Sequence, residues 1–267
     1  MKSPIRLKKY YIESTPELAG MRIIFLSDFH NAKNGALNDS IVDTVKSARP
    51  NLILLGGDMV NGRQPEESYP TALDLVNRMS DISPVYYAYG NHEKKITENI
   101  YGNSDTWDGF RDAVEKKAVF LVNEKTTPVK GLNVYGLDIP PEYYSRGRYP
   151  KLKGATIAEL IGKRDRRGFN ILLGHTPDFF SGYSAWGADL VLSGHYHGGI
   201  IRLPLLGGVI SPRLHLFPKY DYGLYENKKS KMIVTNGIGQ HSIKIRFNNK
   251  PEVVLIIFKE GKENVVK

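Results

Sequence analysis

The chain of 267 residues contains no cysteine. This absence excludes disulfide bonds and thiolate metal ligands, so any metal ion would have to bind oxygen and imidazole nitrogen atoms. It does not identify the compartment, because a chain without thiols is compatible with either redox state. The longest apolar runs, such as residues 253–258, are far shorter than the roughly 18 residues of a membrane-spanning helix.

The basic start, MKSPIRLKKYY, has no apolar segment behind it and is therefore not a complete signal peptide. The sequence is compatible with a cytoplasmic location and with membrane association at the cell envelope. It also lacks Ser/Gly-rich tracts, long blocks of charge and repeats of fixed period. Nothing marks a linker, so we expect residues 1–267 to form a single domain, near the upper limit for one hydrophobic core.

The chain carries a net charge of +9, but its Lys and Arg residues are spread, with modest clusters at residues 163–167, 228–231 and the C-terminus. A solvated surface is the simpler explanation of such a distribution. The alternative is attraction to an anionic partner, either a membrane surface or a polyanion. A nucleic acid is thus a partner that the charge permits without favouring it.

Apolar strand patterns alternate with amphipathic helix patterns along the chain. We expect strands at residues 22–28, 51–58, 84–92, 129–137, 169–173 and 189–193. Helices are expected at residues 37–48, 71–79 and about 105–117. Near the end, residues 222–237 resemble a hairpin that turns near residues 227–230, and residues 251–258 resemble a last strand. The alternation predicts a mixed α/β sandwich in which helices cover the sheet faces.

Polar clusters follow several of these strands and contain five of the seven histidines. The clustered residues are, in chain order, Asp28, His30, Asp58, Asn91, His92, Glu93, His175, His195 and His197. Because ligands collect at the carboxyl ends of strands in α/β sheets, we expect these side chains to converge. Taken singly, a polar residue at a strand end is more often a turn former or a helix cap.

The joint occurrence of these residues favours a metal site. Side chains two residues apart on extended backbone share a face, so the His195-x-His197 pair is the most informative single feature. All the clusters use residue types that suit borderline divalent metals such as Mn, Fe and Zn. Five such clusters at five strand ends are hard to explain as independent turns.

The blocks SDFH, GGD, GNHE, GHTP and GHYH resemble, in this order, the signature of the calcineurin-like metallophosphoesterases: DxH, GD, GNH[DE], GH and GHxH. Weaker likeness in GHYHGGIIRLP, NGIG and IRFNNKPEV resembles a bacterial subgroup of membrane-associated phosphoesterases that includes UDP-2,3-diacylglucosamine hydrolases. The resemblance implies a sandwich of two mixed β-sheets flanked by helices. It also implies hydrolysis of a phosphomonoester or phosphodiester, with a lipid-linked or cell-envelope ester among the options.

The same resemblance assigns roles to the clustered residues. It implies that one metal ion is bound by Asp28, His30 and His197. A second would be bound by Asn91, His175 and His195, with Asp58 shared between the two. His92 would lie beside the substrate and assist the leaving group, with Glu93 supporting it. Tyr196 stands where threonine is frequent in the family and should alter the neighbourhood rather than the metals.

The chemistry of these groups agrees with the implied roles. A carboxylate such as that of Asp58 has two oxygens and can bridge two cations. Two divalent ions can activate a water for in-line attack on phosphorus and neutralise charge on the phosphoryl oxygens. His92 could then supply a proton to the departing oxygen. Two other functions stay open: a nuclease with the same metal centre, and a non-catalytic metal-binding scaffold.

Substrate selection should lie between the ligand blocks. In residues 139–154, Tyr143, Tyr144, Arg146 and Arg148 could contact a phosphate or a base, or could belong to an ordinary surface loop. Residues 203–220 are apolar and rich in glycine and proline, and would contact a membrane or an acyl chain, or pack on the core. The natural substrate, the metal and the oligomeric state are not determined by the sequence.

Overall fold

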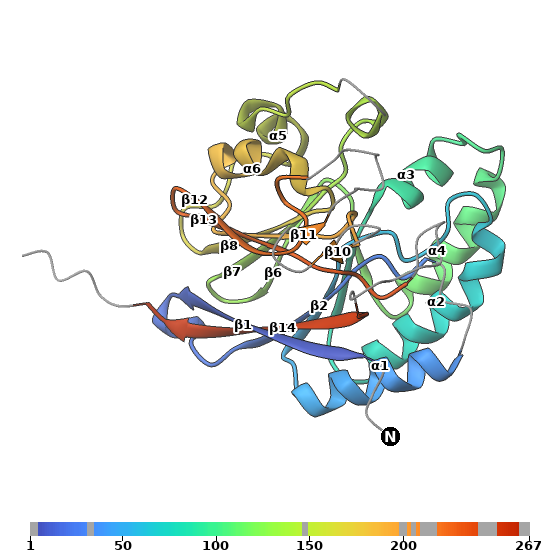
Figure 1. Ribbon diagram of the computed structural model, residues 1–267, viewed down its shortest axis with the longest axis horizontal. Helices are drawn as coiled ribbons and strands as arrows, with labels where there is room; N and C mark the ends of the chain where they lie inside the picture. Colours follow the sequence, from blue (N-terminus) through green and yellow to red (C-terminus); the bar gives the residue numbers. More distant parts are fainter. Residues whose placement is uncertain are drawn as a thin grey trace, which may run out of the picture.

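The computed structural model describes residues 5–30, 35–145, 149–197, 202–203, 207–208, 218–239 and 250–261. Two six-stranded sheets form its centre (Figure 1). The first contains, in spatial order, β1 (Arg6–Ser14), β14 (Glu252–Glu260), β2 (Arg22–Leu26), β3 (Leu52–Leu55), β4 (Val85–Ala88) and β5 (Val119–Leu121). The second contains β12 (Gly223–Asn227), β13 (Ser230–Val234), β9 (Leu190–Ser193), β8 (Phe169–Gly174), β7 (Leu132–Leu137) and β6 (Glu124–Val129). A short pair, β10 (Arg202–Leu203) and β11 (Gly207–Gly208), is separate.

Both sheets are mixed but have parallel centres. In the first sheet β2, β3, β4 and β5 are parallel, whereas β14 runs antiparallel to β2. In the second, β7, β8, β9 and β13 are parallel, and the edge strands β6 and β12 are antiparallel to their neighbours. The two sheets therefore each present a row of carboxyl strand ends, which is where the polar clusters of the sequence fall.

Helices flank the two sheets (Figure 1). Those associated with the first sheet are α1 (Gly35–Ala48), α2 (Pro65–Ser80), α3 (Asn91–Thr97) and α4 (Trp107–Glu115). Those on the second are α5 (Gly154–Ile161) and α6 (Phe180–Trp186). The structure thus has the sandwich of two mixed β-sheets flanked by helices that the sequence predicts.

The central strands are apolar throughout because both of their faces are covered. In β2, Ile24 and Leu26 pack with the helices of the first sheet, whereas Ile23 and Phe25 join the core between the two sheets. This follows from the alternation of side chains across a strand. Buried parallel strands accordingly read as near-continuous apolar runs, as RIIFL does here.

Several elements differ from the sequence-based expectations. Residues 129–137, expected as one strand, form the end of β6 and all of β7, joined at Gly131 with a φ of 85°. Residues 84–92 form β4 and then the start of α3, because the strand ends before Asn91. The start of the chain, considered only as a targeting segment, contains β1, which pairs in parallel with β14.

None of the helices in the described ranges is long and apolar enough to cross a bilayer. The expectation that residues 203–220 contact a membrane or pack on the core falls largely outside the described residues, as do Arg146 and Arg148.

Candidate metal centre

The polar residues that the sequence places at strand ends converge between the carboxyl ends of the two sheets. Asp28 and His30 follow β2, Asp58 follows β3, and Asn91 begins α3 just after β4. From the second sheet, His175 follows β8, and the His195-x-His197 pair follows β9. Three groups of side chains each hold ligand atoms within 4.8 Å of one another, namely Asp28, His30 and His197; His30, Asp58 and His92; and Asp58, His175 and His195.

The first group brings two imidazoles and a carboxylate together. Nε2 of His30 lies 3.2 Å from Nε2 of His197. The same nitrogen of His197 lies 3.6 Å from Oδ1 of Asp28. All three side chains are buried. Nitrogen and oxygen donors that face one another at such distances, away from water, form a set that a divalent cation can bind.

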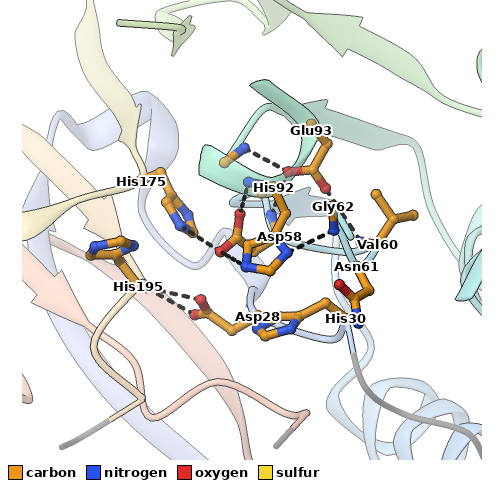
Figure 2. A network of polar contacts seen from close by, with 12 residues as sticks. Asp28, His30, Asp58, Val60, Asn61, Gly62, His92, Glu93, His175 and His195 are labelled. Carbon is orange, nitrogen blue, oxygen red and sulfur yellow. Dashed lines mark hydrogen bonds and ion pairs between the residues drawn. The ribbon is translucent and has the colours of Figure 1, made fainter. Parts of the chain in front are cut away.

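The group of Asp58, His175 and His195 is arranged around the Asp58 carboxylate. Its Oδ2 lies 3.2 Å from Nε2 of His175 (Figure 2). Nδ1 of His175 lies 2.8 Å from the carbonyl oxygen of Gly56, to which it donates. This contact leaves Nε2 as the nitrogen directed at Asp58, and hydrogen bonds of this kind orient metal-binding histidines. The His195 ring lies 5.2 Å from that of His175, between centroids.

Asn91 offers a buried oxygen beside this group. Its side chain is 6% exposed, and among the described residues its Oδ1 has no hydrogen-bond partner. A buried amide oxygen without a partner is costly. A cation bound at Asp58 and His175 would supply the partner that this oxygen lacks.

His92 lies at the exposed side of the centre. Its Nδ1 accepts a hydrogen bond of 2.8 Å from the backbone N–H of Gly62, so in the neutral ring the proton is on Nε2. That Nε2 lies 3.9 Å from Oδ2 of Asp58, and the ring stacks on His30 with centroids 4.5 Å apart. His92 therefore presents an N–H donor toward the centre (Figure 2).

Glu93 contacts a loop other than that of His92, and its support of His92 stays a prediction. It is fully buried, and its carboxylate accepts hydrogen bonds from the backbone N–H groups of Asp58, Met59 and Gly90, at 2.8, 2.7 and 2.9 Å. The hydroxyl of Tyr87 donates a further bond of 2.7 Å. These donors saturate the carboxylate, so its visible role is to position the Asp58 loop against the start of α3 (Figure 2). Sequence position beside His92 could not reveal this, because the contacts are with backbone from another loop.

The backbone is strained at four of the candidate ligands. Asp28, Asp58, His195 and His197 have φ values of 57°, 54°, 69° and 49°. Only eight non-glycine residues of the described ranges have positive φ, so half of them lie in this centre. Such conformations are unfavourable for residues with a Cβ and concentrate at functional sites. Here they aim the side chains inward at the ends of the strands.

The NGIG segment, which the sequence analysis singled out only by its likeness to the family, packs against Asp28. In the NGIG segment, the N–H of Gly239 donates to the carbonyl of Asp28 at 2.7 Å, and that of Ile238 donates to Ser27 at 3.2 Å. Gly237 has a φ of 65°, and a Cβ there would lie 2.7 Å from the Cβ of Asp28. Gly237 and Gly239, just after the buried strand β13, are the signal from which this close approach could have been predicted.

The electrostatic environment of the centre shifts the pKa values of its groups in different directions. Burial raises the pKa of Asp28 to about 7. Burial acts in the same direction on Asp58, but His175, His92 and His30 outweigh it and hold its pKa well below the usual range. Burial lowers the pKa of His175, but the two carboxylates outweigh that effect and raise it to about 9. The buried carboxylates therefore attract positive charge, as metal-binding carboxylates do.

The loop over residues 139–154 reaches the centre through one of its two expected tyrosines. The Tyr144 ring lies 6.2 Å from that of His195, between centroids. Tyr143 packs instead on Phe179, with centroids 5.5 Å apart. The segment therefore walls the centre in part, as the sequence suggested.

Known proteins share both the sequence pattern and the fold. Residues 21–199 match the family model of the calcineurin-like phosphoesterases. The metallophosphoesterase YkuE of Bacillus subtilis is 26% identical, over 90% of this chain and 79% of its own length. The phosphodiesterase YaeI of Escherichia coli is also 26% identical, over 89% of this chain and 82% of its own. Among solved structures, TT1561 of Thermus thermophilus superposes with a TM-score of 0.50 at 13% identity, covering 82% of this chain and 90% of that one.

The family match covers the strands that carry all the candidate ligands, and it favours an enzyme over the non-catalytic scaffold that the sequence left open. The likeness to TT1561 concerns the fold. The chain belongs to the calcineurin-like phosphoesterases, and it is a hydrolase of phosphoric esters.

Proposed function

We propose that the chain is a phosphodiesterase that works with two divalent metal ions. Asp28, His30 and His197 hold one ion. Asn91, His175 and His195 hold the other, and Asp58 is shared. The observation that carries this proposal is that the three ligand groups overlap. His30 belongs to the group with Asp28 and also to the group with Asp58, and Asp58 belongs in turn to the group with His175. Sites that share members in this way suit a pair of adjacent ions.

The donor set fits this pair. It contains carboxylate, amide and imidazole donors, which suit Mn, Fe and Zn. When bound, two such ions supply positive charge against the phosphoryl oxygens and lower the pKa of an attacking water. Two divalent ions bring +4 and the two ligating carboxylates return −2, so the centre keeps positive charge for an anionic ester.

His92 is the proposed proton donor. The bond from Gly62 to its Nδ1 keeps the donor proton on Nε2, on the side that faces Asp58. A donor held in this tautomer can direct its N–H at the departing oxygen and stabilise the charge that develops there by a hydrogen bond. Glu93 acts at a distance from the reaction by holding the Asp58 loop.

A diester is the proposed substrate class because the relative YaeI carries the name phosphodiesterase. The further likeness to UDP-2,3-diacylglucosamine hydrolases supports a lipid-linked or envelope ester within this class, with peripheral membrane contact. We also propose that residues 1–267 form one domain, since apolar residues of both sheets share one core.

The test compares bis-p-nitrophenyl phosphate with p-nitrophenyl phosphate as substrates of metal-stripped protein to which Mn²⁺ is added back. Turnover should require Mn²⁺, favour the diester and be lost in Asp58→Ala. His92→Ala should keep both ions and lower kcat by about 10²–10⁴ for a diester with an alkoxide leaving group, and by much less for p-nitrophenyl esters, whose leaving group needs no proton. Metal-independent turnover, or full turnover in Asp58→Ala, would refute the two-metal proposal.

A further inference from the structure

A small pocket adjoins the candidate metal centre at the junction of α3 and the 3-10 helix η3 (Pro141–Tyr144). We call it the α3–η3 pocket. Its volume is about 170 Å³. Its lining residues include Asn91, Lys94, Lys95, Ile100, Pro141 and Tyr144. No role in the reaction described above uses it.

Two residues of the pocket wall also belong to the metal centre or lie close to it. Asn91 belongs to its wall and is also a proposed metal ligand. Tyr144 lines the pocket, and its ring lies 6.2 Å from the ring of His195. A phosphoryl group at the metals would therefore have one of its ester substituents close to the pocket mouth.

The walls of the pocket are suited to an apolar group. Ile100 is 54% exposed, so its aliphatic surface is available to a ligand. Pro141 and the Tyr144 ring add apolar surface on the other wall.

Of the two lysines that line the pocket, Lys94 has its charge already balanced. The ammonium of Lys94 lies 2.9 Å from Oδ2 of Asp138 and 3.0 Å from Oε1 of Glu98. Burial lowers the pKa of Lys94, but the two carboxylates outweigh this effect and keep the amine charged and paired. This pair also ties α3 to the end of β7, which fixes one wall of the pocket. A paired ammonium does not call for a second anion in the pocket.

The volume limits the size of the occupant. A cavity of about 150 Å³ in another protein holds one benzene molecule. The α3–η3 pocket, at about 170 Å³, matches one ring or an aliphatic group of similar size. It is too small for the whole of a long acyl chain.

We propose that the α3–η3 pocket binds an apolar substituent, about the size of a phenyl ring, on the phosphoester substrate. The inference rests on the proposed function, because the phosphoryl group must be anchored at the metals. Ile100 and Tyr144 are then the residues that select the substituent.

The test measures binding of methylphosphonate and phenylphosphonate to the Mn²⁺-loaded protein by calorimetry. Both ligands present the same anion to the metals and differ in the group that would enter the pocket. Phenylphosphonate should bind about tenfold more tightly, as expected for partial burial of a ring. In Ile100→Ser and in Tyr144→Ser the advantage should fall to about threefold or less, because each removes one apolar wall.

The matched control is Val119→Ser, since Val119 is 51% exposed on β5 and does not line this pocket. It should keep the full advantage of phenylphosphonate. Equal affinities for the two phosphonates, or an unchanged advantage in both pocket variants, would overturn the inference and leave the metal centre intact. Failure of both phosphonates to bind in a Mn²⁺-dependent way would count against the proposed function itself, and the inference would fall with it.

Discussion

At the scale of single residues, the centre depends on side chains that hold its loops as well as on its ligands. Tyr196 lies between the two strained histidines, is 1% exposed, and donates a hydrogen bond from its hydroxyl to Oδ1 of Asp178. Asp178 lies three residues beyond His175. The bond therefore ties the loop that follows β9 to the loop that follows β8.

Tyr196→Phe should weaken metal binding by about tenfold, since residues that orient metal ligands contribute about 10–100-fold in affinity. Competition with a chromophoric chelator measures the change. Tyr225→Phe is the control, because Tyr225 donates a similar bond of 2.7 Å to Asp221, outside the centre. Equal affinities in wild type and Tyr196→Phe would show that packing alone holds the loop.

Glu93→Gln should lower the free energy of unfolding of the metal-free protein by about 2–3 kcal/mol. The amide group of glutamine would face N–H donors that the carboxylate now accepts, and leaving a buried donor unpaired costs about 1–3 kcal/mol. Urea unfolding measures the loss. Glu226→Gln, on an exposed side chain, should change stability by less than about 0.5 kcal/mol. A similar small effect in Glu93→Gln would rule out the positioning role.

At the scale of elements, the strand ends approach one another so closely that glycine is required. A Cβ at Gly194 would collide with Oδ2 of Asp28 and Oγ of Ser27. We expect Gly194→Ala to displace the His195 loop and to lower Mn²⁺ affinity by at least about tenfold. Calorimetric titration of Mn²⁺ tests this.

Gly109→Ala is the contrasting substitution. Gly109 lies in α4, where a Cβ would meet nothing within 4 Å. Alanine there should raise the free energy of unfolding by about 0.5–1 kcal/mol, because it restricts the unfolded chain and favours helix. Mn²⁺ affinity should not change. If Gly194→Ala proved as harmless as Gly109→Ala, close approach would not explain the glycine.

The sequence predicted the central elements well because their causes are local. The buried runs of β2, β3, β8 and β9 and the periodicity of α1 can be read directly from the chain. Elements defined by distant partners were missed. β1 pairs with β14 from the other end of the chain, and its pattern of half-buried polar residues does not mark a strand by itself.

The same distinction applies to the centre. Residue types and strand ends predicted which side chains converge, from Asp28 to His197. The contacts of Glu93 with the Asp58 loop, and the cover that Gly239 provides over Asp28, depend on the packing of separate loops. The positive φ values of the candidate ligands likewise arise from this packing, and no local pattern encodes them.

At the scale of the whole molecule, the core between the sheets should couple the two halves into one folding unit. The chain's two tryptophans provide fluorescence signals from the two sides of the sandwich. Trp107 packs with the helices of the first sheet, and Trp186 packs with those of the second. In urea, the variants Trp107→Phe and Trp186→Phe should therefore unfold with fluorescence transitions that coincide with far-UV circular dichroism in each variant. Two separate transitions would contradict the single-domain proposal.

The central claim is that this one chain binds two adjacent metal ions through a shared Asp58. Mn²⁺ titration followed by electron paramagnetic resonance tests it most directly, because two neighbouring Mn²⁺ ions couple magnetically. The account predicts two Mn²⁺ per chain with a coupled spectrum, and loss of the coupled signal in Asp58→Ala. A single bound ion, or two ions with an uncoupled spectrum, would contradict it.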